Sequence, residues 1–156
     1  MFNKKIFLSG FILICFITGC AAPFMKGINA NGQKVYLDQA DITQTEAYQE
    51  YLQSEHTEIN KERYIFKRVV GAKDLRYHRD GNTYGWVEAY RAGNWLMRTH
   101  YDKEADARSF IRDHVWKSET TGNPHLIQFP SGDIHVAYYV LLNELDLLED
   151  TLAKQS

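Results

Sequence analysis

The chain has very few cysteines, and their positions exclude one kind of stabilisation. Only Cys15 and Cys20 are present among its 156 residues, so residues 21–156 can form no disulfide bond. Small exported domains often depend on such bonds. A folded part of this chain must be stabilised by its core alone, and a domain of about 100 residues buries enough surface to achieve this.

The chain also lacks an excess of basic residues. It has 18 Lys and Arg against 20 Asp and Glu, which gives a formal net charge of -2. Nucleic acids and anionic lipid surfaces are bound through basic patches. We therefore expect no nucleic acid partner, and no binding to a membrane through surface charge.

The apolar run near the N-terminus is too short for a transmembrane helix. Residues 6–17 are apolar except for Ser9 and Gly10. Twelve helical residues span about 18 Å, against a hydrocarbon core of about 30 Å. The five residues before the run carry two positive charges and no acid. This pattern is typical of a secretory signal rather than of an uncleaved membrane helix.

The residues Ile17-Thr18-Gly19-Cys20 that follow resemble the lipobox of bacterial lipoproteins. The resemblance implies that residues 1–19 are a signal peptide and that Cys20 is the lipidation site, with acyl chains such as palmitate that hold the protein on a membrane. Ala21, rather than Asp, follows the cysteine, which implies the outer membrane facing the periplasm. The alternative is an ordinary secretory signal in which Cys20 is only a small residue.

Beyond the signal, the sequence predicts a short N-terminal segment and one globular domain. Residues 20–56 are expected to form a tether, a small hairpin at Asn31-Gly32 and a short helix capped at Thr43, three residues before Glu46. Residues 57–156 are expected to form the single domain, without internal repeats.

Hydrophobic periodicity and turn residues place the elements of this domain. Helices are predicted at about 57–71, 86–99, 104–117 and 134–152, and strands at 75–78 and 125–129. The first strand runs into a tight turn at Asp80-Gly81. The fold class is therefore α+β: a small, mostly helical domain with four to five helices and two to three short antiparallel strands.

Three segments, in order, resemble the YfeK-like family of small exported bacterial proteins: residues 73–81, residues 92–96, and Phe110-Ile111 followed by residues 118–125. The family pattern has an aromatic-x-Arg-Asn-Gly turn, an Ala-x-x-His-Leu helix and a Ser-Gly-x-Pro-Tyr turn. Asp80, Trp95 and His125 stand where the family has Asn, His and Tyr, and Glu119 interrupts its serine run. The resemblance covers about residues 59–145. It implies a shared fold and an exported location, but no activity.

No catalytic or metal-binding motif is visible in the sequence. The six histidines include no His-x-x-x-His pair, and acylation of Cys20 would leave no thiolate, so neither a metal nor another cofactor is expected. Ser118 has no Gly-x-Ser-x-Gly sequence around it and is expected to end a helix. Nothing in the sequence singles out one pair among the 20 acidic residues as the two carboxylates that glycoside hydrolysis requires.

Tyrosine and tryptophan are abundant, with ten and three residues. Five tyrosines are too many for so small a core: Tyr48, Tyr51, Tyr101, Tyr138 and Tyr139. Because tyrosine is enriched at protein interfaces, we expect an interaction surface. Its candidate residues are Arg79, Asp80, Trp95, Ser118 and His125.

These observations predict a lipid-anchored periplasmic protein that binds another envelope protein and is not an enzyme. A more specific function of the same kind is that of an immunity or inhibitor lipoprotein against a cell-wall-targeting toxin. Two functions of a different kind stay open: a binder of glycans or small ligands through Tyr and Trp and, last, a hydrolase built on Ser118 or a carboxylate pair.

Overall fold

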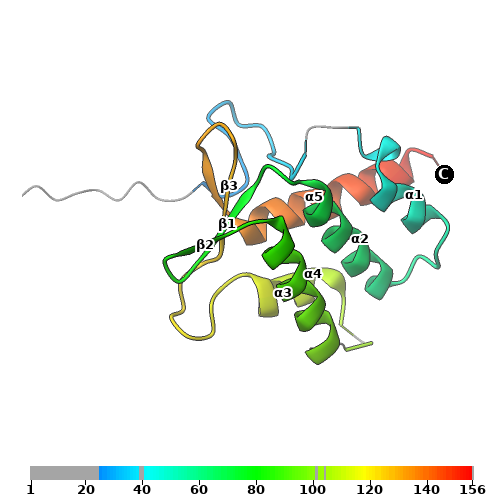
Figure 1. The fold of residues 1–156 in the computed structure, drawn as a ribbon. Helices are drawn as coiled ribbons and strands as arrows, with labels where there is room; N and C mark the ends of the chain where they lie inside the picture. Colours follow the sequence, from blue (N-terminus) through cyan, green and yellow to red (C-terminus); the bar gives the residue numbers. More distant parts are fainter. Residues whose placement is uncertain (1–24, 39–40, 101, 104, 156) are drawn as a thin grey trace, which may run out of the picture.

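The structure, a computed structural model, describes residues 25–38, 41–100, 102–103 and 105–155 (Figure 1). Its elements follow in the order η1 (Ile42–Gln44), α1 (Glu46–Leu52), α2 (Glu58–Gly71), β1 (Arg76–Arg79), β2 (Asn82–Tyr84), α3 (Trp86–Thr99), α4 (Ala107–Phe110), η2 (Ile111–Val115), β3 (Leu126–Gln128), β4 (Ile134–Val136) and α5 (Ala137–Ala153). The predicted α+β class is confirmed. The expected signal peptide and Cys20 lie outside the described residues.

The strands form one antiparallel sheet in the order β2-β1-β3-β4. Arg79 pairs with Asn82, so only Asp80 and Gly81 form the turn between β1 and β2. Both have left-handed φ angles, 52° and 79°, which is the backbone of a type I′ hairpin turn. The tight turn therefore lies where the sequence predicted it.

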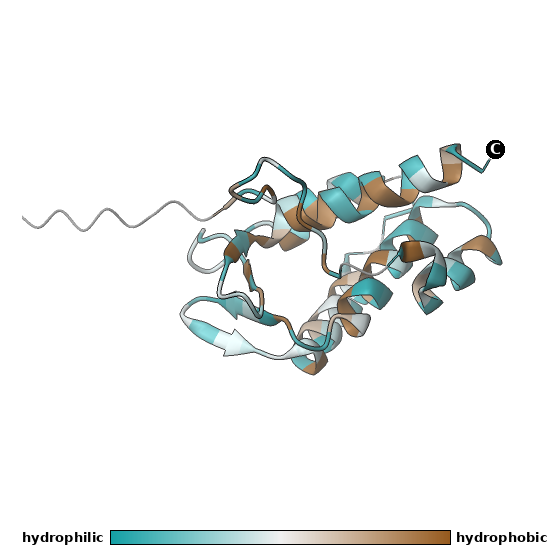
Figure 2. Ribbon diagram, turned by 90° about the horizontal axis from the view of Figure 1, so that it is seen from above, coloured by the Kyte–Doolittle hydropathy of each residue, from teal (hydrophilic) through white to brown (hydrophobic). Residues whose placement is uncertain are grey.

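One core joins the helices and the sheet. Figure 1 places the sheet at one end of the molecule and α1 at the other, close to the C-terminus. Brown hydrophobic bands alternate with teal ones along the helices in Figure 2, as expected for amphipathic helices that bury one side. Tyr64 of α2, Ile127 of β3 and Leu145 of α5 are each almost fully buried in this core. Among the helices in the described part, none is long and apolar enough to cross a bilayer.

The N-terminal residues 25–38 are bound to the domain rather than free as a tether. The Met25 N–H donates to Ile134 O at 3.1 Å, and Val136 N–H donates to Met25 O at 2.9 Å. The Asn143 side-chain amide donates to Gly27 O at 2.7 Å and to a second carbonyl of this segment. Because β4 and α5 meet these backbone groups, the segment becomes part of the fold.

Some boundaries differ from the predicted ones for local reasons. Asp41 accepts the Thr43 N–H at 3.0 Å and so starts η1, which moves the cap of α1 from Thr43 to Thr45. The helix predicted over 104–117 begins at Ala107, after Asp106, whose carboxylate caps α4, and it ends as the π-helical turn η2. The start of the predicted helix 134–152 is strand β4.

The structure places some of the tyrosines in the core and others at the surface. Tyr48 and Tyr51 belong to the core and are 1% and 3% exposed, so an interaction surface does not include them. The exposed large aromatic side chains of the described part are Tyr84, Tyr90 and Trp95. Of the other tyrosines named from the sequence, Tyr101 lies outside the described residues, whereas Tyr138 and Tyr139 are half-buried.

Candidate functional site

Asp80 joins the β1–β2 turn to the loop that follows η2. Its carboxylate accepts hydrogen bonds from Ser118 Oγ at 2.7 Å and from the Thr121 hydroxyl. Arg79 Nε lies 3.4 Å from the same carboxylate. The two hydroxyls, with the arginine, hold the pKa of Asp80 below its ordinary value. Asp80 therefore stays ionised at neutral pH and fixes this loop.

Two less exposed side chains, Ser118 and His125, also form hydrogen bonds in this region. Ser118 is only 2% exposed, and its Oγ also accepts the Thr120 N–H at 3.2 Å. His125 Nδ1 donates to Val115 O at 2.8 Å, because a carbonyl can only accept. Burial lowers the pKa of His125, although the bond to Val115 opposes this. Both side chains hold the loop in place.

Trp95 lies in a different row of rings, which runs from the surface toward the core. It is 59% exposed, and its ring packs edge-on to His100 with centroids 5.8 Å apart. His100 stacks on His114 at 4.3 Å, and His114 lies 5.2 Å from Phe110. Four of the five candidate residues therefore lie together, namely Arg79, Asp80, Ser118 and His125. The fifth, Trp95, lies apart from them near the end of α3.

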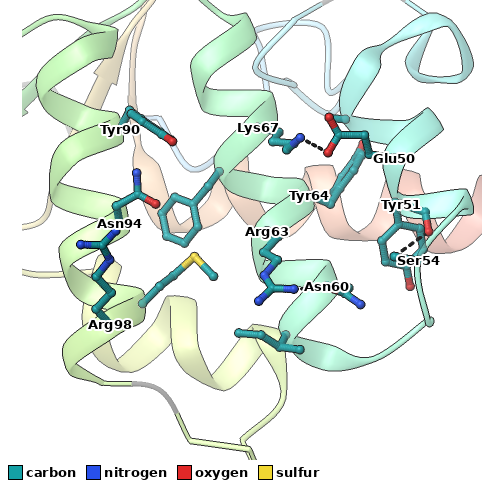
Figure 3. A pocket seen from close by; sticks show the side chains of 14 residues that line it. Glu50, Tyr51, Ser54, Asn60, Arg63, Tyr64, Lys67, Tyr90, Asn94 and Arg98 are labelled. Atoms are coloured by element: carbon teal, nitrogen blue, oxygen red, sulfur yellow. Dashed lines mark hydrogen bonds and ion pairs between the residues drawn. The ribbon is translucent and has the colours of Figure 1, made fainter.

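A groove of about 800 Å³ between α1, α2 and α3 is a better candidate for a binding site (Figure 3). Phe66 and Met97 provide apolar surface, and Tyr90 lines it while 40% exposed. In Figure 3 Asn94 and Arg98 come from α3, whereas Asn60 and Arg63 come from α2. A partner in the groove would therefore contact both helices.

The groove contains two arginines that form no ion pair among the described residues. Lys67 forms an ion pair with Glu50, whereas Arg63 Nη1 donates to the amide oxygen of Asn60, at 2.9 Å. Within the described ranges, neither Arg63 nor Arg98 forms an ion pair with a carboxylate. The groove is thus locally basic in a chain whose net charge is -2.

Close contact between α2 and α3 shapes the floor of this groove. A Cβ on Gly93 would lie 2.2 Å from Cε1 of Phe66, so the ring packs where only glycine leaves room. A glycine within a helix costs stability unless packing requires it. Gly93 is the one feature of the sequence that could have indicated the close approach of the two helices. No pattern in the sequence identifies Arg63 or Arg98 as residues of a binding groove.

Two buried polar groups lie on the same helix. Glu62 is 4% exposed, and its Oε2 has no hydrogen-bond partner in the described part of the chain. Burial, with a smaller contribution from Glu58, raises the pKa of Glu62 to about 7. The Tyr64 hydroxyl also lacks a described partner, and burial raises its pKa above the ordinary value. Glu62 does not line the groove, and Tyr64 lines it with a side chain that is only 1% exposed.

No protein-family model matches the chain, and neither a curated protein nor a solved structure shows significant similarity to it. The resemblance to the YfeK-like family therefore stays a prediction.

Proposed function

We propose that this chain is a lipid-anchored envelope protein, not an enzyme, whose groove between α2 and α3 binds an acidic segment of another envelope protein. The observation that supports this most strongly is the pair of guanidinium groups in the groove. Arg63 and Arg98 stand on two helices beside apolar surface, and in the described part of the chain no carboxylate neutralises them.

The chemistry of these side chains favours a carboxylate-bearing partner. A guanidinium is always charged, and its planar donors match a carboxylate oxygen pair. Arginine and tyrosine are also the side chains that contribute most at protein interfaces. Tyr90 and Met97 in the groove can pack on the apolar stems of a bound segment, since methionine adapts to irregular shapes.

The size and charge of the groove favour a short segment over a whole domain. A volume of about 800 Å³ suits a few side chains. The chain as a whole is acidic and would repel an acidic partner elsewhere on its surface. Attraction limited to the groove would therefore orient the partner as it approaches.

Anchoring at Cys20 would hold the sheet end of the domain close to the membrane. Met25 is hydrogen-bonded to β4, so only four residues lie between the proposed acylation site and the folded domain. The five residue-to-residue steps from Cys20 to Met25 reach at most about 17 Å when extended. The partner would then be a membrane protein or a protein held near the same bilayer.

Capture from detergent-solubilised envelopes tests this function. The bait is residues 20–156 carrying Cys20→Ser, compared with the same chain carrying Arg63→Glu and Arg98→Glu. Arg91→Glu is the matched control, because Arg91 is on α3 and exposed but does not line the groove. We expect the unsubstituted bait and the control to capture one protein in stoichiometric amount, and the double variant to lose it. Equal capture by all three, or by none, contradicts the proposal.

A second candidate is glycan binding at Trp95, favoured by the 59% exposure of this side chain. Exposed indole rings stack well on apolar ring faces. Titration with peptidoglycan fragments, followed by tryptophan fluorescence, distinguishes the two functions. A saturable response that Trp95→Ala abolishes and the Arg63→Glu, Arg98→Glu variant retains would favour the glycan.

A further inference from the structure

Three side chains that are distant in the sequence meet at the C-terminal end of α3. His100 is the C-cap of this helix, His114 lies in η2, and Glu119 lies in the loop that Asp80 holds. Each offers one ligand atom, and these three atoms lie within 4.8 Å of one another. The sequence predicted no metal here, because thirteen residues lie between the two histidines and no spacing motif links them.

The surroundings of His114 leave a ring nitrogen free to act as a ligand. Its Nδ1 is buried, and no hydrogen-bond partner for it is found among the described residues. A buried nitrogen without a partner is costly and calls for an explanation. A ring nitrogen with no other partner is available to a metal ion, because imidazole binds metals through its ring nitrogens.

The two rings and the carboxylate form a recognisable ligand set. We propose that His100, His114 and Glu119 bind one divalent transition-metal ion, with Zn²⁺ as the best fit, and leave one coordination position open. Two imidazoles and one carboxylate are a set that zinc uses when a fourth position is open to water or substrate. The nitrogen ligands disfavour Ca²⁺ and Mg²⁺, which prefer oxygen.

The geometry needs only a small adjustment. Tetrahedral zinc with bonds of about 2.0–2.1 Å places its ligand atoms about 3.3 Å apart. Glu119 is exposed, so its carboxylate can close the remaining distance. The negative end of the α3 dipole also favours a cation at this position. A bound ion would tie the end of α3 to η2 and the loop after it, beside the exposed Trp95.

Calorimetric titration with ZnCl₂ tests this site on residues 20–156 carrying Cys20→Ser, after removal of any histidine tag and of bound metal. We expect one ion per chain. His100→Ala and Glu119→Gln should each weaken binding by about tenfold or more, because loss of even an outer ligand partner costs that much. His56→Ala is the control, since His56 is exposed and distant in the chain from the three ligands.

Two further measurements distinguish the loss of a metal ligand from the misfolding of a variant. Glu119→Gln changes an exposed side chain, so its circular dichroism should match the unsubstituted protein. Cu²⁺ should quench the fluorescence of Trp95, whose ring lies 5.8 Å from that of His100, and Trp95→Phe should remove the quenched component. Absence of a saturable heat, or unchanged affinity in both His100→Ala and Glu119→Gln, would overturn the proposal.

Discussion

Arg68 and Glu144 form an ion pair in the interior of the protein, with Arg68 Nε 2.9 Å from Glu144 Oε2. The two residues are 3% and 0% exposed. The other carboxylate oxygen, Oε1, accepts the backbone N–H of Leu37 at 2.7 Å. One side chain of α5 therefore holds both α2 and the N-terminal segment, and its negative charge is compensated from both sides.

Removal of this charge should strongly destabilise the fold. Glu144→Gln leaves the Arg68 guanidinium buried without a counter-charge, and we expect a loss of about 3–5 kcal/mol in the free energy of unfolding. Glu50→Gln is the matched control, because its partner Lys67 is exposed and such pairs contribute about 1 kcal/mol or less. Urea unfolding measures both. Similar losses in the two variants would contradict this account of the buried pair.

Glu62 should make stability depend on pH in the opposite direction to an ordinary carboxylate. Its pKa of about 7 in the folded protein lies above the ordinary value of 4.5. Between these two values the folded state binds more protons than the unfolded state, so stability falls as pH rises from about 4.5 to 7. The full effect is roughly 3 kcal/mol.

Glu62→Gln should remove this contribution. Urea midpoints measured at pH 5 and pH 8 are expected to differ less for the variant than for the unsubstituted protein, and the variant should be the more stable at pH 8. The same change between the two pH values in both proteins would show that Glu62 is not the group responsible.

Gly93 should tolerate no larger side chain. Gly93→Ala places its Cβ against the Phe66 ring, and forced packing of this kind costs about 1–3 kcal/mol. At Gly71, the last residue of α2, an added Cβ meets no atom within 4 Å, so Gly71→Ala should be neutral or slightly stabilising. Thermal unfolding of the two variants compares them directly. An unchanged melting temperature in Gly93→Ala would contradict the close packing of α2 on α3.

Strong local signals made much of the fold predictable. The Asp80-Gly81 turn, the apolar stripe of α2 and the strand before Pro130 each carry a pattern set by nearby residues. Strand β2 was missed because all three of its residues are exposed, so it shows no alternation of buried and exposed side chains. Strand β4 was missed because it runs directly into α5, so their apolar residues form one continuous pattern.

The candidate sites were less predictable, because contacts between distant segments create them. Asp80 and Ser118 were both named as candidate surface residues, and the structure adds that Ser118 Oγ donates to the Asp80 carboxylate at 2.7 Å. The groove and the His100–His114 pair depend on how α3 packs against α2 and η2. No spacing in the sequence reports such packing, so Arg63, Arg98 and Glu119 carried no signal.

Anchoring at Cys20 can be tested separately from binding. Cys20→Ser should abolish incorporation of labelled palmitate and move the protein from the membrane to the soluble fraction, since one or more acyl chains supply the attachment. Cys15→Ser is the matched control and should leave both unchanged, because Cys15 lies within the predicted signal peptide. Membrane attachment that persists in Cys20→Ser would contradict the lipoprotein assignment.

Site-specific photo-crosslinking in intact cells tests the groove most directly. A photoreactive amino acid replaces Asn94, which lines the groove, or Arg91, which is exposed on the same helix outside it. The account predicts one discrete protein adduct from position 94, lost when Arg63→Glu and Arg98→Glu are added, and none from position 91. No adduct from position 94, or the same adduct from both positions, would contradict the groove as the binding site.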